Sequence, residues 1–128
     1  DAAVQAARQI LVQLESTNRF SVRIGINTGN CIIADIGSRR AGRMDRTCIG
    51  DMVNVAQRLM TKAEPNTAVF SRYTYLALTD KPADISTLTP QQLKGKTFPV
   101  LSYQLHVHSL AKIASVQAIR LAPMALAS

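Results

Sequence analysis

TCIGDMVNVAQR, at residues 47–58, joins a short β-branched segment to a helix. Gly50 ends the predicted strand, and the helix begins at Asp51, whose carboxylate is favourable near the positive end of the helix dipole. The helix is predicted to end near Glu64-Pro65. We expect a core-facing apolar stripe on it, formed by Met52, Val53, Ala56, Leu59 and Met60.

Asn54 and Arg58 lie four residues apart in this helix, so their side chains project from one face. An amide one turn before a guanidinium can bind a sugar oxygen and a phosphate together. Arginine suits phosphate charge because its planar fork donates several hydrogen bonds and stays protonated. An ordinary solvated helix face shows the same spacing, and from these two residues alone that interpretation is preferred.

The chain before this stretch predicts one helix and two strands. Residues 1–17 carry apolar side chains at helical spacing, and residues 20–27 alternate in the manner of a strand. Residues 31–36 form a second β-branched run after a turn that contains Gly29, which favours a hairpin or bent strand pair. The arginine-rich residues 38–46 are interpreted as an exposed loop.

The chain after this stretch predicts a strand at 67–70, a helix capped by Ser71, and a loop at 79–90. A closing strand pair is expected at 92–96 and 100–107. The alternating elements favour an α+β fold, a ferredoxin-like α/β sandwich with helices on one face of a mostly antiparallel sheet. The first helix has no strand before it, so the N-terminal strands of the domain are expected to be missing.

The composition limits what the chain can do. Its 128 residues suffice for one domain, predicted at 1–108, with an Ala-rich tail or linker at 109–128. No apolar run reaches the ~18 to 20 residues that span a bilayer, and no membrane contact is expected. The net charge of +7 favours anionic partners. Cys31 and Cys48 are interpreted as buried, reduced thiols.

Four strings in order resemble the class III adenylate/guanylate cyclase catalytic domain. RIGINTG at 23–29 resembles the family's R-[IV]-G-[IL]-[HN]-x-G strand, and DRTCIGD at 45–51 resembles D-Y-T-x-I-G-D. Residues 50–58 resemble G-x-x-V-N-x-A-x-R, and LKGK at 93–96 resembles the late K-G-K strand. The sequence departs from the family's usual residues at Asp35, Arg46 and Gln57.

This resemblance implies roles for three side chains. Asn54 would contact the ribose and orient the attacking 3′-hydroxyl. Arg58 would stabilise charge on the α-phosphate in the transition state. Lys94, the first lysine of K-G-K, would bind the terminal phosphates.

The resemblance also implies a site for the base. Thr47 takes the position at which the family reads the purine edge, with Cys48 and Ile49 facing the base through their backbones. A threonine hydroxyl both donates and accepts a hydrogen bond, so the choice between ATP and GTP stays open. A threonine at this position resembles a bacterial-type subgroup of the family.

The implied reaction is cyclisation of a nucleoside triphosphate to the 3′,5′-cyclic nucleotide and pyrophosphate. In the family, two Mg²⁺ or Mn²⁺ ions are held by two aspartates, which are expected upstream of this chain. Asp45 and Asp51 are not assigned as these metal ligands, because structural roles are preferred for both. The site would form between two domains, which implies a homodimer or paired cyclase domain, and the fragment alone is expected to be inactive.

Two other functions remain open from the sequence. A catalytically inactive cyclase-like domain could regulate or dimerise. A basic ferredoxin-like nucleic-acid-binding module is the third alternative, but with no Trp and three Phe the chain offers no stacking platform, so no nucleic-acid partner is expected. The expected location is cytoplasmic.

Overall fold

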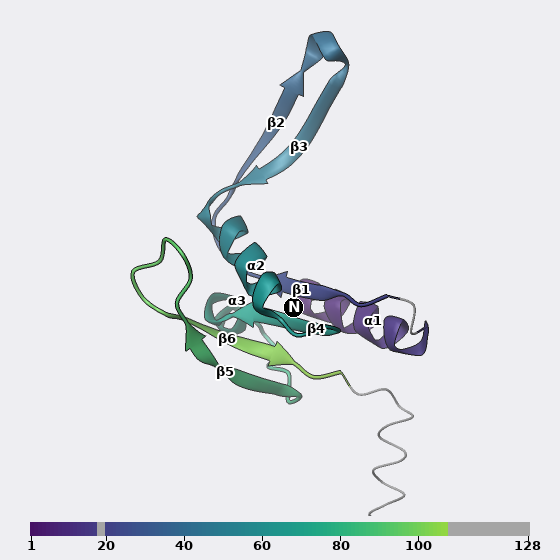
Figure 1. Ribbon diagram of the computed structural model, residues 1–128, viewed down its shortest axis with the longest axis vertical. Helices are drawn as coiled ribbons and strands as arrows, with labels where there is room; N and C mark the ends of the chain where they lie inside the picture. Colours follow the sequence, from purple (N-terminus) through teal and green to yellow (C-terminus); the bar gives the residue numbers. More distant parts are fainter. Residues whose placement is uncertain (18–19, 108–128) are drawn as a thin grey trace, which may run out of the picture.

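The computed structural model describes residues 1–17 and 20–107 (Figure 1). The order of helices and strands is the predicted one. The tail predicted at 109–128 lies outside the described residues. The elements are α1 (Ala2–Thr17), β1 (Arg23–Ile26), β2 (Ile32–Ser38), a 3₁₀ turn (Arg39–Ala41), β3 (Arg43–Ile49), α2 (Asp51–Lys62), β4 (Thr67–Ser71), α3 (Arg72–Ala77), β5 (Ile85–Gln91) and β6 (Val100–Leu105).

Four strands form the central sheet in the order β1-β4-β6-β5. β1 and β4 are parallel, whereas β4–β6 and β5–β6 are antiparallel. The predicted α+β fold with a mostly antiparallel sheet is therefore confirmed. Ser71 ends β4 and caps α3, as predicted, because its hydroxyl accepts a hydrogen bond from the Thr74 backbone N–H at 3.2 Å.

Helices cover both faces of this sheet. Successive strand residues point to opposite faces, and in β4 Ala68 and Phe70 pack in the α1 core while Val69 packs in the α2 core. The prediction of helices on one face was wrong, because β4 is a central strand whose apolar residues are buried on both sides. The α1 core contains Val4, Ala7, Leu11, Ala68, Phe70, Leu78 and Leu105, and the α2 core contains Val55, Leu59, Ala63, Val69 and Leu93.

The backbone of α2 lies directly against β1 at Gly25. A Cβ at this position would overlap the Ala56 carbonyl oxygen and lie 2.7 Å from the Met60 backbone nitrogen. This orientation buries Val55, which the predicted stripe omitted, and leaves Val53 and Met60 exposed. The stripe was therefore partly wrong, because contact with β1 and β4 sets the rotation of the helix about its axis.

Strands β2 and β3 form an antiparallel two-stranded arm, with a register that runs from Ile32↔Ile49 to Ser38↔Arg43. Figure 1 shows this arm projecting away from the sheet and helices. The predicted pairing of 20–27 with 31–36 was wrong, because β1 pairs with β4 instead. The predicted loop at 38–46 largely belongs to the arm, where charged residues fit because β3 is exposed along its whole length.

The strand before β6 lies earlier than predicted. Residues 85–91 form β5, within the predicted loop, while 92–96 form a turn in which Gly95 adopts a φ of 77°. Threonines 87 and 89 made the segment look like a polar loop, but β-branched threonine fits a half-exposed strand. The turn between β5 and β6 therefore carries the K-G-K motif.

A charged pair joins α1 to the segment before β5. The Arg8 guanidinium makes a two-point contact with the Asp84 carboxylate, in which Nη2 donates to Oδ1 at 2.7 Å. This hydrogen bonding raises the pKa of Arg8. None of the helices in the described ranges is long and apolar enough to cross a membrane.

Candidate functional site

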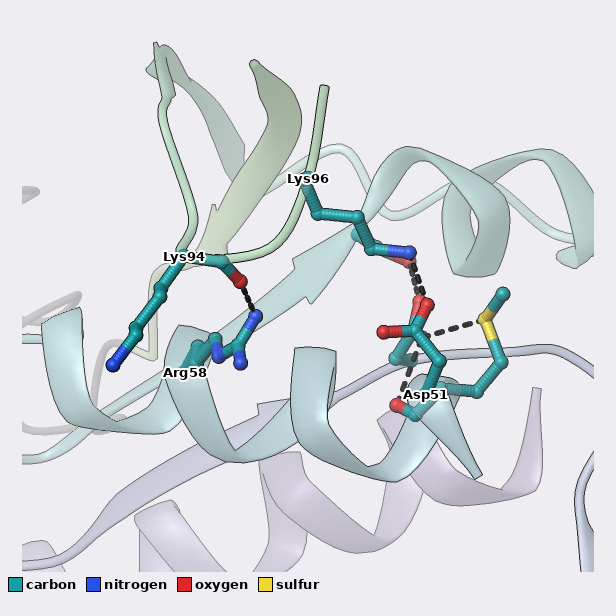
Figure 2. Close-up of polar contacts among 7 residues, drawn as sticks. Asp51, Arg58, Lys94 and Lys96 are labelled. Atoms are coloured by element: carbon teal, nitrogen blue, oxygen red, sulfur yellow. Dashed lines mark hydrogen bonds and ion pairs between the residues drawn. The ribbon is translucent and has the colours of Figure 1, made fainter. Parts of the chain in front are cut away.

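The candidate site lies where α2 meets the turn between β5 and β6 (Figure 2). Arg58 is half-buried in the third turn of α2, and its Nη1 donates a hydrogen bond to the backbone carbonyl oxygen of Lys94. The structure thus brings together two residues that lie 36 positions apart in the sequence. It places Lys94 in the turn that follows β5, with an exposed side chain.

A second contact holds the same turn to the beginning of α2. The Lys96 ammonium forms an ion pair with the Asp51 carboxylate in the first helical turn. The side chain of Lys96 is 27% exposed and that of Asp51 55%. Because Asp51 and Arg58 are about 10 Å apart along the helix axis, the K-G-K turn is fastened to α2 at two separate points.

Gly95 allows the two lysines to diverge. Its φ of 77° lies in the left-handed region that side chains disfavour. Figure 2 shows Lys94 beside Arg58 and Lys96 farther along the turn, above Asp51. The Lys96–Asp51 pair was missed in the sequence, because no pattern links residues 45 positions apart before the fold is known.

Asn54 is exposed on α2, one turn before Arg58, as the spacing predicted. The helix beneath it is anchored to the sheet by Asn27, whose side-chain amide donates to the Met52 carbonyl oxygen at 3.0 Å. The Ser71 hydroxyl donates to Asn27 Oδ1 at 2.5 Å. This second polar anchor was also missed, although Asn27 belongs to the RIGINTG string.

The residues proposed to face the base lie on the arm. Thr47, Cys48 and Ile49 are exposed at the end of β3 that leads into α2. Arg58 and Lys94 lie farther along, at the third turn of α2. The residues predicted to face the base and those predicted to bind phosphate therefore lie at different ends of the region formed by the arm and α2. The prediction that Cys31 and Cys48 are buried was wrong: both are exposed, because β3 has no covering layer.

A groove of about 590 Å³ lies on the other side of the K-G-K turn, between α2, α3 and β6. Met52, Tyr73 and Phe98 are among its lining residues, together with Lys96. None of the six predicted site residues lines it.

The described residues do not supply a metal site. Within 1–17 and 20–107, no cluster of three or more His, Cys, Asp or Glu side chains could hold a metal ion. Asp51 is paired with Lys96, and Asp45 lies 4.0 Å from Arg43 on the arm. Asp51 thus begins α2, as predicted, and the structural roles of both aspartates stay predictions.

The comparisons with known proteins agree with this fold. The sequence profile described as "Adenylate and Guanylate cyclase catalytic domain" matches residues 3–107. The chain therefore belongs to the adenylate and guanylate cyclase catalytic domain family. No curated protein matches it significantly in sequence.

Several solved structures share the fold. The catalytic core of a rhodopsin-guanylyl cyclase with converted specificity, in complex with ATPαS, has a TM-score of 0.68 at 23% identity over 83% of this chain and 58% of its own. The adenylyl cyclase CyaB from P. aeruginosa has a TM-score of 0.59 at 30% identity, over 85% of this chain and 56% of its own.

A third similar structure, the adenylate/guanylate cyclase/hydrolase from Silicibacter pomeroyi, has a TM-score of 0.63 at 30% identity. Its match covers 84% of this chain and 62% of the other. The chain thus spans less than two thirds of each of these three structures.

Proposed function

We propose that this chain is part of a nucleotidyl cyclase that converts ATP or GTP to the 3′,5′-cyclic nucleotide and pyrophosphate. The observation that carries the proposal is the contact between Arg58 and the Lys94 carbonyl oxygen, which holds the K-G-K turn against the helix that also bears Asn54 one turn earlier. A triphosphate and its ribose need this combination of charge and amide. Family membership and the fold support the proposal.

In the proposed reaction, the ribose 3′-oxygen attacks the α-phosphorus. One P–O bond forms, the proton of the 3′-hydroxyl is released to water, the bond between the α-phosphorus and the oxygen that bridges to the β-phosphate breaks, and pyrophosphate leaves. Asn54 orients the ribose, and Lys94 holds the terminal phosphates. Arg58 donates hydrogen bonds to oxygens on which negative charge develops, using guanidinium N–H groups other than the one bound to Lys94. Fixing Arg58 against the turn lowers the entropy that is lost when substrate binds.

Two Mg²⁺ or Mn²⁺ ions belong to the proposal and would supply electrophilic assistance at the phosphates. The described residues do not form a site for them, so their carboxylate ligands are assigned to residues outside this chain. The chemistry attributed to Asn54, Arg58 and Lys94 rests on positioning and charge, as in other phosphoryl transfers.

The proposal assigns Thr47, with the backbones of Cys48 and Ile49, to the purine. These residues lie on the arm, apart from the phosphate-binding group, so a complete site needs a second surface that faces both. We therefore propose a homodimer or paired cyclase domain, with a cytoplasmic location, and no turnover by this fragment alone. Similar structures are known in complex with ATPαS and with GTP.

The test is a cyclase assay of the full-length protein with manganese and either ATP or GTP. We expect product from one of them, and an Arg58→Ala variant should lose at least ~100-fold in kcat, equivalent to ~2.7 kcal/mol of transition-state stabilisation. Gln57→Ala, at the adjacent exposed position, is the matched control and should retain activity.

No product from a folded, dimeric parent protein would reject the proposal in favour of an inactive regulatory domain. Product formation that survives Arg58→Ala would reject the role of this arginine while keeping the activity.

A further inference from the structure

Cys31 and Cys48 lie close enough to react with one another. Their Sγ atoms are 3.0 Å apart, and both residues are exposed. In the arm, Cys48 lies opposite Ile33, and Cys31 precedes Ile33 by two residues. Residues two apart share a face of a strand, so the cysteines are diagonal neighbours on one face of the arm.

From this geometry we infer that Cys31 and Cys48 form a redox-active thiol pair that a small-molecule disulfide converts to an intrachain disulfide bond. An S–S bond is about 2.05 Å long, so the sulfurs must approach by about 1 Å. Cys31 precedes β2, outside the ladder of the arm, which leaves it free to make this small adjustment. The inference does not depend on the proposed cyclase function.

The step proceeds by two thiol–disulfide exchanges. The Cys31 thiolate attacks one sulfur of the small disulfide, forms a mixed disulfide and expels a thiolate. Cys48 then loses its proton, attacks the Cys31 sulfur and releases the second thiol. Two protein thiols have then lost two protons and two electrons, and the oxidant has become two thiols.

The hydrogen bond between the thiols raises the pKa of Cys48. Cys31 is assigned the first attack because it lies before β2, outside the ladder of the arm, whereas Cys48 is held within β3. The chain contains two cysteines in all, so no other thiol of the same molecule competes for either sulfur.

The bond would join the two strands at the base of the arm. It would close a loop of residues 31–48, which contains all of the arm except Ile49, close to Gly50, where the chain enters α2. Cross-linking at this point ties to one another the two chain segments that connect the arm to the body.

The experiment equilibrates the chain with mixtures of reduced and oxidised glutathione, alkylates free thiols and measures intact mass and disulfide-linked peptides. The expected product is the Cys31–Cys48 disulfide, with an equilibrium constant at least about tenfold larger in the folded chain than in concentrated urea. Equal equilibrium constants in the folded chain and in urea, a ratio near one, would overturn the inference. Oxidation that yields only glutathione adducts or cross-linked dimers would overturn it too.

The matched control is the double variant Cys31→Ser with Ile32→Cys. It keeps two cysteines at nearly the same sequence separation but turns one thiol to the opposite face of the arm. In this variant, the equilibrium constant for disulfide formation in the folded chain should be about equal to that in urea, while the circular dichroism spectrum stays unchanged. A folded-to-urea ratio equal to that of the parent chain would overturn the geometric argument. If the variant fails to fold, the ratio of the parent chain decides alone.

Discussion

Strands β3 and β4 have opposite surroundings. All seven residues of β3 are exposed, whereas four of the five residues of β4 are buried. β4 pairs on both edges and packs against a helix on each face. β3 pairs on one edge only, with β2, and projects from the body (Figure 1).

This contrast separates the part that stabilises the fold from the part that is available for contact. Isolated exposed apolar side chains are common, but several on one small element indicate an interaction surface. The arm carries five, of which three on one face of the hairpin are isoleucines. They are Ile32, Ile33, Ile36, Met44 and Ile49.

The largest difference should appear when one side chain is truncated in each region. Phe70→Ala removes a completely buried ring that stacks on Tyr103, and should lower the free energy of unfolding by ~3 to 5 kcal/mol. Ile33→Ala on the arm should change it by less than ~0.5 kcal/mol. Urea denaturation measures both values. Phe98→Ala is the substitution-matched control, since Phe98 is 78% exposed, and a loss there as large as at Phe70 would contradict the assigned core.

The body of the fold was largely predictable from the sequence, whereas the arm was predicted only as strand segments at 31–36 and 47–49 and not as a paired element. Helical spacing placed α1 and α2, and the short apolar run 67–70 placed β4. The arm contains Asp35, Asp45 and Arg46, so it lacks the alternation of a strand with one buried face. Strand partners also depend on contacts between distant residues, which explains why β1 was paired with the wrong neighbour.

A smaller effect is expected where the site-bearing helix meets the sheet. Gly25→Ala would place a methyl group against the backbone of Ala56 and Met60, which cannot rotate away. Overpacking of this kind costs ~1 to 3 kcal/mol and should move α2 relative to β1. Gly29→Ala is the control, because its methyl group would meet the flexible Met52 side chain. Equal losses in urea denaturation would show that α2 is not held by the backbone contact at Gly25.

The candidate site was predictable only in part, because some of its contacts join residues that lie far apart in the sequence. A helix repeat placed Asn54 and Arg58 on one face without any tertiary information. The contact of Arg58 with Lys94 and the pairing of Asp51 with Lys96 depend on where the β5–β6 turn lies, and that turn was itself predicted as a strand. Local periodicity carries no information about such contacts.

A still smaller effect is expected at the second attachment of that turn. Lys96→Met keeps most of the side-chain stem but removes the charge that pairs with Asp51, which should cost ~0 to 1 kcal/mol because the pair is partly exposed. The loss should shrink as salt is added. Lys94→Met, two residues earlier and exposed, should leave unfolding unchanged. A salt-independent loss above ~2 kcal/mol would mean that Lys96 acts through packing instead of charge.

The smallest effect on folding, and the sharpest separation of the two regions, is expected for Ile36→Ser. Ile36 is 51% exposed on the arm, so the free energy of unfolding of the monomer should change by less than ~0.5 kcal/mol. If the arm contacts a second copy of the chain, removal of this side chain should raise the dimer dissociation constant at least ~10-fold, or ~1.4 kcal/mol. Sedimentation equilibrium of the full-length protein measures this constant.

The control for that experiment is Ile10→Ser, because Ile10 is 47% exposed on α1 in the body. The same substitution there should change the free energy of unfolding by less than ~0.5 kcal/mol, because isoleucine and serine have similar helix propensities, and should leave the dissociation constant unchanged. If both variants weakened association equally, the arm would have no special part in it. If Ile36→Ser alone weakened association, the exposed apolar surface of the arm would be the surface that a second chain covers.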